Sequence, residues 1–127
     1  MHRSDANGFG HEKEQTTNFK ARAQRIRELN DQFRCTGRGG RQFITPGIQE
    51  LGLLAVLTIR QLVSSYDAFS EDNDPYGEHD LGNLTYRNKK VFWKIDYYDA
   101  TLSAGSPDPA DPTVTTRVLT IMLAQEY

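Results

Sequence analysis

Hydrophobic positions recur every three or four residues between residues 16 and 36, which predicts an amphipathic helix in this part of the chain. The recurring positions are Phe19, Ala23, Ile26, Asn30 and Phe33. Four basic residues lie largely off this stripe and are expected on the outer side of the helix: Lys20, Arg25, Arg27 and Arg34. Gly37 follows the pattern, and a glycine at this place can adopt the left-handed conformation that ends a helix.

A short strand and a second helix are predicted next. Residues 38–41, RGGR, read as a flexible basic turn, and residues 42–45 as a short strand. Pro46 and Gly47 then begin a helix that extends to about Tyr66 or Phe69. Apolar residues occupy most of the circumference of this helix, so we expect it to be buried on more than one side.

A hairpin is predicted from residues 82–86 and 90–98, which have strand character and are joined by a short polar connection. Because side chains alternate along a strand, the second strand has two distinct faces. The predicted core face holds Val91, Trp93, Ile95 and Tyr97, and the other face holds Phe92, Lys94, Asp96 and Tyr98.

The last predicted element is a helix over residues 114–125, which follows the Pro-rich residues 106–112. Its expected buried stripe contains Val114, Val118, Ile121 and Met122. The order of elements is then helix, strand, helix, hairpin, helix. This order predicts an α+β domain in which a small, mainly antiparallel sheet of about three strands packs against three helices.

One domain is expected from the size and composition of the chain. It has 127 residues, of which 37% are hydrophobic and 25% charged, values that are normal for a globular domain. Residues 1–15 lack periodicity and are expected to be a mobile arm, so the domain is assigned to residues 16–127. The chain shows no membrane-spanning apolar run, no secretory signal and a single cysteine, which together predict a cytoplasmic protein.

The strongest chemical signal is the acidic segment at residues 67–80, DAFSEDNDPYGEHD. It holds six carboxylates and one histidine in fourteen residues, without Lys or Arg, so it requires a cation, a basic partner or water around it. The net charge of the chain is only −2, but residues 1–41 hold nine Lys and Arg against five Asp and Glu, and residues 42–127 hold six against twelve. This asymmetry favours oriented contact with a charged partner, although two solvated surfaces would also explain it.

A divalent cation, Mg²⁺, Mn²⁺ or Ca²⁺, is one candidate ligand of the acidic segment, because carboxylate oxygens are the preferred ligands of hard cations. The candidate metal ligands are Asp72, Asp74, Glu78 and Asp80. Asp72, Asp74 and Gly77 match the first, third and sixth positions of an EF-hand loop. Tyr76 stands at the fifth position and Asn83 at the twelfth, so a true EF-hand is not predicted.

The candidate catalytic residues are His79, Lys94, Asp96 and Arg117. His79 lies between two carboxylates and has the character of a general base, but a histidine that ties the segment to the body of the domain is the favoured interpretation. Four aspartates would either complete a multi-carboxylate metal site or form turns and helix caps: Asp96, Asp99, Asp108 and Asp111. The chain contains no nucleophile elbow, phosphate loop, dinucleotide fingerprint or zinc-protease motif.

Three blocks of the sequence, EDNDPYGEHD, FWKIDYYD and SPDPADPTVTTRVLTIMLA, resemble the signature blocks of a small bacterial family catalogued as a domain of unknown function. The resemblance covers roughly Arg25 to Tyr127 and includes the IRELND, TGRGGR and TPG blocks. Members of that family resemble accessory proteins encoded on plasmids and other mobile elements. The resemblance therefore implies a helper role and supplies no known active site.

The favoured functional hypothesis is a non-catalytic binding module that contacts the basic surface of a host or plasmid protein. One such partner would be a nucleic-acid-targeting system, which the module would inhibit. Its predicted binding residues are Asp72, Asp74, Tyr76, Glu78, His79, Asp80, Lys94, Asp96 and Tyr98. No membrane partner is expected.

Two other functions remain as hypotheses. A metal-dependent hydrolase of the nuclease or phosphatase type requires one cleft to hold Asp72, Asp74, His79, Asp96 and Arg117. Direct nucleic-acid binding, which is less favoured than binding to a protein, requires a continuous acid-free patch of Arg22, Arg25, Arg34, Arg38 and Arg41.

Overall fold

The computed structural model describes the backbone of residues 4–127 and the side chains of residues 18–127. Over this part of the chain it contains three α-helices, four strands and a C-terminal 3₁₀ turn. In chain order these are α1 (Ser4–Thr36), β1 (Gly40–Ile44), α2 (Pro46–Gln49), α3 (Leu53–Ser64), β2 (Leu81–Tyr86), β3 (Lys89–Tyr98), β4 (Thr116–Leu123) and η1 (Ala124–Glu126). The predicted α+β class with a small, mostly antiparallel sheet is confirmed.

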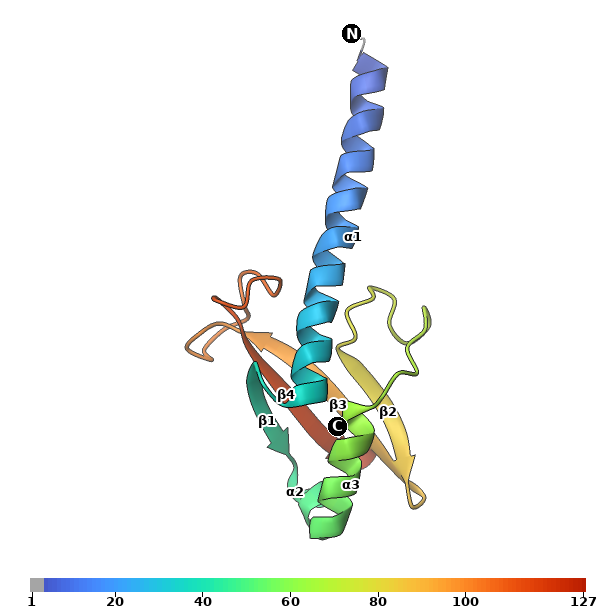
Figure 1. Ribbon diagram of the computed structural model, residues 1–127, viewed down its shortest axis with the longest axis vertical. Helices are drawn as coiled ribbons and strands as arrows, with labels where there is room; N and C mark the ends of the chain where they lie inside the picture. Colours follow the sequence, from blue (N-terminus) through green and yellow to red (C-terminus); the bar gives the residue numbers. More distant parts are fainter. Residues whose placement is uncertain (1–3) are drawn as a thin grey trace.

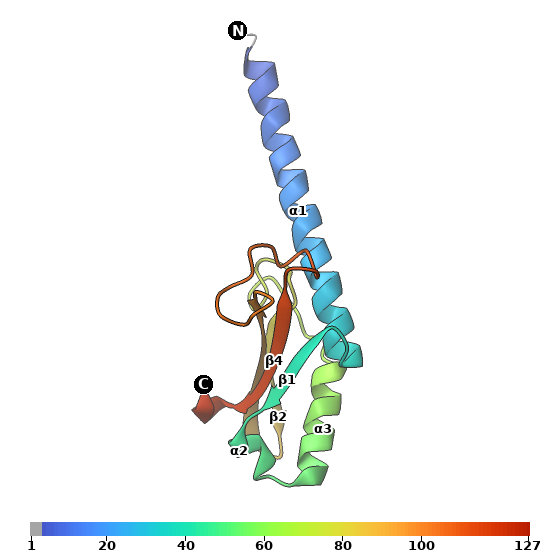
Figure 2. The same ribbon diagram turned by 90° about the vertical axis from the view of Figure 1, so that its left-hand side faces the viewer.

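The four strands form one sheet in the order β1-β4-β3-β2. β1 runs parallel to β4, and the other two pairs are antiparallel. Helices α1 and α3 lie on one side of the sheet, and η1 projects toward the other side (Figures 1 and 2). We call that other side the open face. Its strand residues are Arg41, Phe43, Leu81, Asn83, Thr85, Lys90, Phe92, Lys94, Asp96, Tyr98, Thr116, Val118, Thr120 and Met122.

The hydrophobic core lies between the sheet and the helices. The sheet contributes the alternating buried residues Val91, Trp93, Ile95, Leu119 and Ile121. The helices contribute Phe33, Ile48, Ile59 and Val63. The predicted core face of β3 is therefore confirmed, with Trp93 only 1% exposed at its centre. The hairpin is also confirmed, and its two-residue turn, Arg87-Asn88, has positive φ angles of 47° and 67°, which match the right-handed twist of the strands.

The predicted final helix over residues 114–125 is wrong, because this part of the chain forms β4. β4 is an inner strand, with β1 on one side and β3 on the other. Its core face carries Leu119 and Ile121, and its open face carries Val118 and Met122, so apolar residues occupy both faces. Residues 118–123 contain one polar residue, Thr120, so the hydrophobic pattern of this segment does not show the alternation of a strand and does not distinguish it from a buried helix.

The predicted second helix is interrupted and is less buried than expected. Gly52 has φ 102°, a left-handed conformation that cannot continue a helix, and it separates α2 from α3. Helix α3 buries one side only, through Ala55, Ile59 and Val63. The remaining leucines project away from the core, with Leu53 75%, Leu54 70% and Leu57 58% exposed.

The first helix begins at Ser4 rather than near Thr16, and it extends past the sheet (Figure 1). Residues 1–3 lie outside the described part of the chain, and the predicted mobility of residues 1–15 stays a prediction. Gly37 ends the helix as predicted, with φ 77° and a hydrogen bond from its amide to the carbonyl of Phe33. The prediction for Arg34 is wrong, because this side chain is only 3% exposed. Its guanidinium donates to the carbonyls of Val63 and Tyr66 and so joins α1 to the end of α3.

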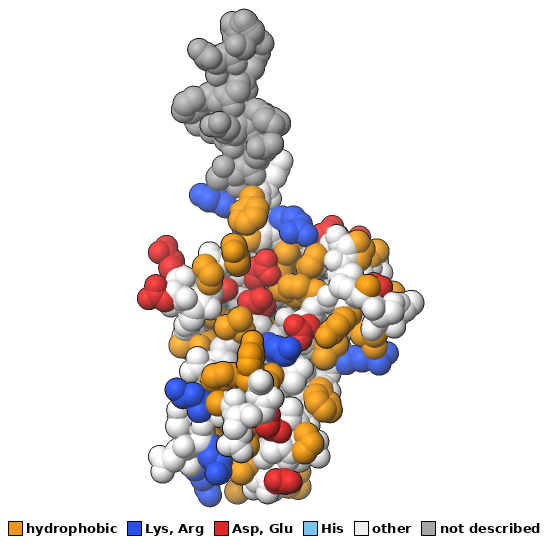
Figure 3. Space-filling view, turned by 180° about the vertical axis from the view of Figure 1, so that it is seen from behind, with side chains coloured by type: hydrophobic (Ala, Val, Ile, Leu, Met, Phe, Trp, Pro, Cys, Tyr) orange, Lys and Arg blue, Asp and Glu red, His pale blue; other side chains and the backbone are white. Residues whose placement is uncertain are grey.

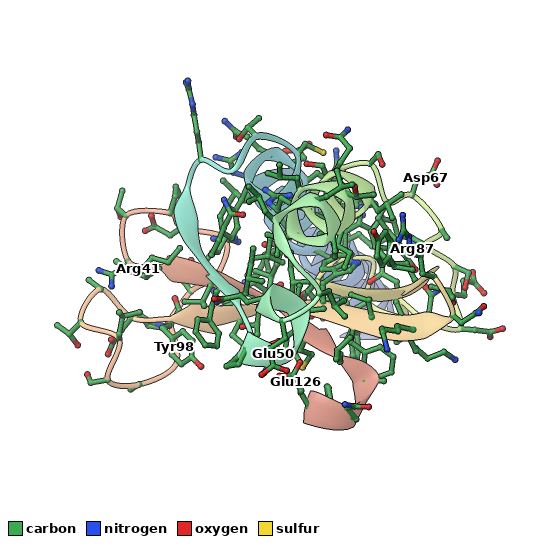
Figure 4. All side chains as sticks on the ribbon, turned by 90° about the horizontal axis from the view of Figure 1, so that it is seen from below. Arg41, Glu50, Asp67, Arg87, Tyr98 and Glu126 are labelled. Atoms are coloured by element: carbon green, nitrogen blue, oxygen red, sulfur yellow. The ribbon has the colours of Figure 1, made fainter. Side chains whose placement is uncertain are left out.

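The C-terminal turn is attached to the start of α2 through Glu126 (Figure 4). The Glu126 carboxylate accepts hydrogen bonds from the Thr45 hydroxyl at 2.6 Å and from the amides of Gly47 and Leu123 at 2.9 Å each. The hydrogen bond from Thr45 is the largest of the effects that hold the pKa of Glu126 below its usual value. None of the described helices is both long and apolar enough to cross a membrane.

Candidate functional site

The acidic segment forms a loop, residues 67–80, that connects α3 to β2 and is held against α1 (Figure 1). We call it the acidic loop. Two side chains of α1 bind its backbone: Arg27 donates to the carbonyl of Gly77 at 2.9 Å, and Asn30 donates to the carbonyl of Glu78 at 3.0 Å. The loop is therefore fixed in place by the protein itself.

Asp74 organises the acidic loop from within. It is only 9% exposed, and its carboxylate accepts hydrogen bonds from the amides of Glu78 at 3.1 Å and His79 at 3.2 Å. Its own carbonyl accepts from the amide of Gly77. A carboxylate directed at loop amides in this way satisfies buried donors that would otherwise lack a partner.

His79 lies between two carboxylates of the protein. Its Nδ1 is 2.8 Å from Asp31 on α1, and its Nε2 is 3.6 Å from Asp74. The ring stacks on Phe69 with centroids 3.7 Å apart, and the backbone adopts the left-handed φ of 55°. This geometry supports the interpretation that His79 ties the acidic loop to α1, since both ring nitrogens already face groups of the fold.

A chain of hydrogen bonds links a buried cation to a carboxylate of the acidic loop. Arg117 Nε donates to Asn30 Oδ1 at 2.7 Å, Asn30 Nδ2 donates to the Tyr97 hydroxyl at 2.8 Å, and this hydroxyl donates to Glu78 Oε1 at 2.8 Å. Asn30 is fully buried, and Arg117 is 2% exposed. Arg117 also donates from Nη2 to the carbonyl of Pro109 at 2.5 Å, which adds the Pro-rich connection to the network.

Burial fixes the protonation states of this network. It raises the pKa of the Tyr97 hydroxyl far above its usual range, so Tyr97 remains a donor. It also lowers the pKa of Arg117, although a guanidinium retains its charge at any physiological pH. The network therefore runs in one direction, from the Arg117 cation through two neutral groups to the Glu78 carboxylate.

Two of the predicted site residues lie on the opposite side of the sheet. Lys94 and Asp96 share the open face and form an ion pair with Nζ 3.0 Å from Oδ2. The hydrogen bond to Asp96 raises the pKa of Lys94. Tyr98 follows on the same face, and Figure 4 shows it away from the helices.

The residues required for a metal-dependent hydrolase do not meet in one cleft. Arg117 and Tyr97 point to the helix side of the sheet, whereas Asp96 alternates onto the open face. Asp72 lies in an exposed turn of the acidic loop, and Asp74 is directed at loop amides. Within the described residues, no three His, Cys, Asp or Glu side chains are grouped as metal ligands. This arrangement does not favour the hydrolase hypothesis.

The other aspartates considered for that site form turns. Asp99 accepts from the amide of Ser103 and the hydroxyl of Thr101, and these bonds lower the pKa of its carboxyl. Asp111 accepts hydrogen bonds from the hydroxyl and the amide of Thr113, and these bonds lower the pKa of its carboxyl. Asp108 accepts from the amide of Ala110 and pairs with Arg22 of α1 at 3.1 Å. Their positions match turn formation.

The basic residues of α1 do not form the continuous patch that nucleic-acid binding would require. Arg34 is buried, Arg22 pairs with Asp108, and Arg25 lies 3.8 Å from Glu28. Carboxylates therefore interrupt the row of arginines.

A cavity of about 380 Å³ lies on the open face, at the end where β2 begins. Its side-chain lining from that face is Leu81, Asn83, Phe92, Lys94, Asp96 and Met122, and Tyr127 and Asp80 complete it. Tyr127 closes one side by an edge-to-face contact with Phe92 at 5.8 Å. The cavity thus combines apolar walls with two carboxylates and one ammonium group.

Asp80 is expected to weaken the fold at neutral pH. Partial burial and the neighbouring carboxylates, above all that of Glu78, raise the pKa of the Asp80 carboxyl in the folded state. A folded protein that holds this proton more tightly loses stability as the pH rises through the unfolded and then the folded pKa. We therefore expect Asp80→Asn to raise the melting temperature near pH 7 and to leave it unchanged near pH 3.

Melting curves recorded by circular dichroism at both pH values would measure this effect. Asp72→Asn is the matched control, because Asp72 is exposed in the same loop and no shift in stability is expected. A lower melting temperature for Asp80→Asn near pH 7 would show that the ionised carboxylate is stabilised in the fold.

Sequence reasoning missed the residues that position the acidic loop. Asn30 was placed on the apolar stripe of the first helix and Tyr97 on the core face of a strand, but their polar groups were not linked to the loop. The available signal was Asn30 itself, because an amide on an apolar stripe must find buried hydrogen-bond partners. Nothing in the sequence indicated that these partners are Tyr97, Glu78 and Arg117.

The comparison with sequence families gives a match to a protein of unknown function, DUF3768, over residues 44–126. The match includes the acidic loop and the whole of β2, β3 and β4, and it begins after α1. No curated protein and no solved structure matches the chain. The matched range covers more than half of the chain, so the protein belongs to the DUF3768 family.

Proposed function

We propose that this protein is a non-catalytic binding module that contacts a basic protein partner through its open face. One observation carries the proposal: large apolar side chains are exposed around the cavity on a sheet side that no described α-helix covers. Phe43 is 55% exposed, Leu81 47% and Tyr127 81%. Hydrophobic side chains are spread across this side of the molecule, with charged groups between them (Figure 3). A surface of this composition is typical of a protein interface.

The carboxylates of the cavity, and those of the acidic loop beside it, favour a partner with Lys or Arg side chains. Asp80 and Asp96 line the cavity, and Asp96 is paired with Lys94. Partial burial, and after it the charge of Glu78, raises the pKa of Asp80, for which no ion pair is formed among the described residues. The acidic loop lies beside β2 and exposes Tyr76 to 68%. Its exposed carboxylates are Asp67, Glu71 and Asp72. A lysine or arginine inserted beside Leu81 would bury its alkyl chain and neutralise this charge.

The proposed class of partner rests on the resemblance of the sequence to accessory proteins of mobile elements. Such a protein would contact a host or plasmid protein, and a nucleic-acid-targeting system offers the basic surface that the open face requires. The buried Asp74 and the partly buried His79 of the acidic loop would then support the surface without touching the partner.

The experiment is a peptide array with two classes of peptide. The basic apolar peptides combine an aromatic or aliphatic residue with Lys and Arg, and the acidic apolar peptides combine it with Asp and Glu. The wild-type protein is expected to bind the basic apolar peptides, and this binding is expected to weaken at high salt concentration. The test variant is Phe43→Ser/Leu81→Ser, and the matched control is Leu53→Ser/Leu54→Ser, which removes two exposed apolar side chains on α3, on the opposite side of the sheet. Only the open-face variant is expected to lose binding.

Two results would contradict the proposal. Binding that is lost in the α3 variant and kept in the open-face variant would assign the interface to α3. Equal binding of basic and acidic peptides would show that the carboxylates of the open face do not select the partner.

A further inference from the structure

A second cavity lies on the helix side of the sheet, between α1, the turn that follows it and the Pro-rich connection. Its volume is about 330 Å³. The polar side chains in its lining are Arg25, Gln32, Arg38, Thr115 and Arg117. No Asp or Glu is among the described residues that line it. Three guanidinium groups therefore border one concave site without a carboxylate.

Arg117 is the least solvated of these cations. It is 2% exposed, and it uses Nε and Nη2 for Asn30 and Pro109, both of which are neutral acceptors. Within the described part of the chain, no carboxylate lies within ion-pair distance of Arg117 and Nη1 donates no hydrogen bond. A buried cation without an ion-pair partner is costly, and a counter-ion in the cavity would lower that cost.

The other two arginines add to the positive potential of the cavity. Burial is the main cause of the lowered pKa of Arg117; the charge of Arg25 lowers it further, whereas Tyr97 and Glu78 raise it. Arg25 is half exposed, and its contact with Glu28 is loose at 3.8 Å. Arg38, in the turn after α1, forms no ion pair with any described carboxylate. Among the described residues, Glu28 is therefore the one carboxylate within ion-pair distance of these three arginines, and it lies outside the cavity lining.

We propose that this cavity binds the phosphate group of a small phosphate monoester. Guanidinium groups match phosphate oxygens through paired N–H donors, and a dianion balances three cations better than a carboxylate does. The volume suits a small ligand and is at the lower end of the range for small-molecule sites. The site is separate from the open face, so it stands or falls independently of the proposed partner.

The test is a calorimetric titration of the full-length protein with adenosine monophosphate, inorganic phosphate and adenosine. The two phosphates are expected to bind saturably and adenosine is not. Arg25→Gln and Arg38→Gln are each expected to weaken binding of adenosine monophosphate by about tenfold, since each removes a charged hydrogen-bond donor. Arg41→Gln is the matched control, because Arg41 is exposed in β1 and lies outside the cavity lining.

Three results would overturn the proposal. The first is no saturable heat with either phosphate at millimolar concentration. The second is binding that Arg25→Gln and Arg38→Gln leave unchanged. The third is tight binding of a single-stranded oligonucleotide without a terminal phosphate, together with no binding of adenosine monophosphate. This result would show that the arginines bind the backbone of a nucleic acid.

Discussion

Asn30→Ala is expected to reduce the free energy of unfolding by about 3–5 kcal/mol, because it removes the acceptor of the buried Arg117 Nε together with two further hydrogen bonds. The amide of Asn30 joins three groups that are distant in sequence: Arg117 Nε, the Tyr97 hydroxyl and the carbonyl of Glu78. An alanine at this position would remove all three hydrogen bonds in a site that is closed to water, since Asn30 is 0% exposed. Arg117 would keep its bond to the carbonyl of Pro109, and the Tyr97 hydroxyl would keep its bond to Glu78.

Urea denaturation followed by the fluorescence of Trp93, the single tryptophan, would measure this loss. Gln24→Ala is the matched control on the same helix, where the side chain is exposed and a change of about 0.5 kcal/mol or less is expected. Tyr97→Phe removes one hydroxyl and is expected to cost about 1–3 kcal/mol, with strong coupling to Asn30→Ala in a double-mutant cycle. Additive effects of the two substitutions would show that the hydrogen-bond chain does not act as a unit.

Trp93→Ala is expected to cost about 3–5 kcal/mol by opening a large cavity at the centre of the core. Trp93 is 1% exposed and packs edge-to-face against Tyr66 at 5.4 Å and Phe69 at 6.1 Å. The guanidinium of Arg34 lies 5.3 Å from its ring. Loss of the indole would therefore also weaken the contacts that join α1, the end of α3 and the acidic loop.

Far-UV circular dichroism in urea is the appropriate measurement, because this variant has no tryptophan fluorescence. Trp93→Phe is the control: Nε1 of Trp93 has no hydrogen-bond partner among the described residues, so the change removes only packing and is expected to cost about 1–2 kcal/mol. Equal costs for the alanine and phenylalanine variants would mean that the indole nitrogen contributes more than its contacts indicate.

The wrong prediction of a final helix shows where the local hydrophobic pattern no longer indicates the secondary structure. The hairpin and its core face were predictable because β3 alternates between buried and open positions, and the Arg87-Asn88 connection has the length of a tight turn. The pattern of β4 predicts a helix, because β4 is an inner strand and carries apolar side chains on both of its faces. The pairing that makes it a strand comes from β1 and β3, which lie far from it in the sequence.

The candidate site shows the same limit. The sequence predicted that Lys94 and Asp96 share a face, and the two side chains form an ion pair there. It could not predict that Asp74 and His79 are used by the fold itself, because their partners are loop amides and Asp31 of a distant helix. The cavity with Arg25, Arg38 and Arg117 was likewise not predictable, since its residues come from α1, the following turn and β4.

By itself, the sequence of this protein determined the α+β class, the amphipathic end of the first helix, the hairpin and the alternation of β3, because periodicity and turn chemistry act over a few neighbouring residues. Only the tertiary structure decided that residues 116–123 form an inner strand, that the helices cover one side of the sheet, and that the carboxylates of the acidic loop are divided between internal contacts and an exposed surface. Those outcomes depend on burial and on hydrogen bonds between distant segments, and a short stretch of sequence does not encode which segments will meet.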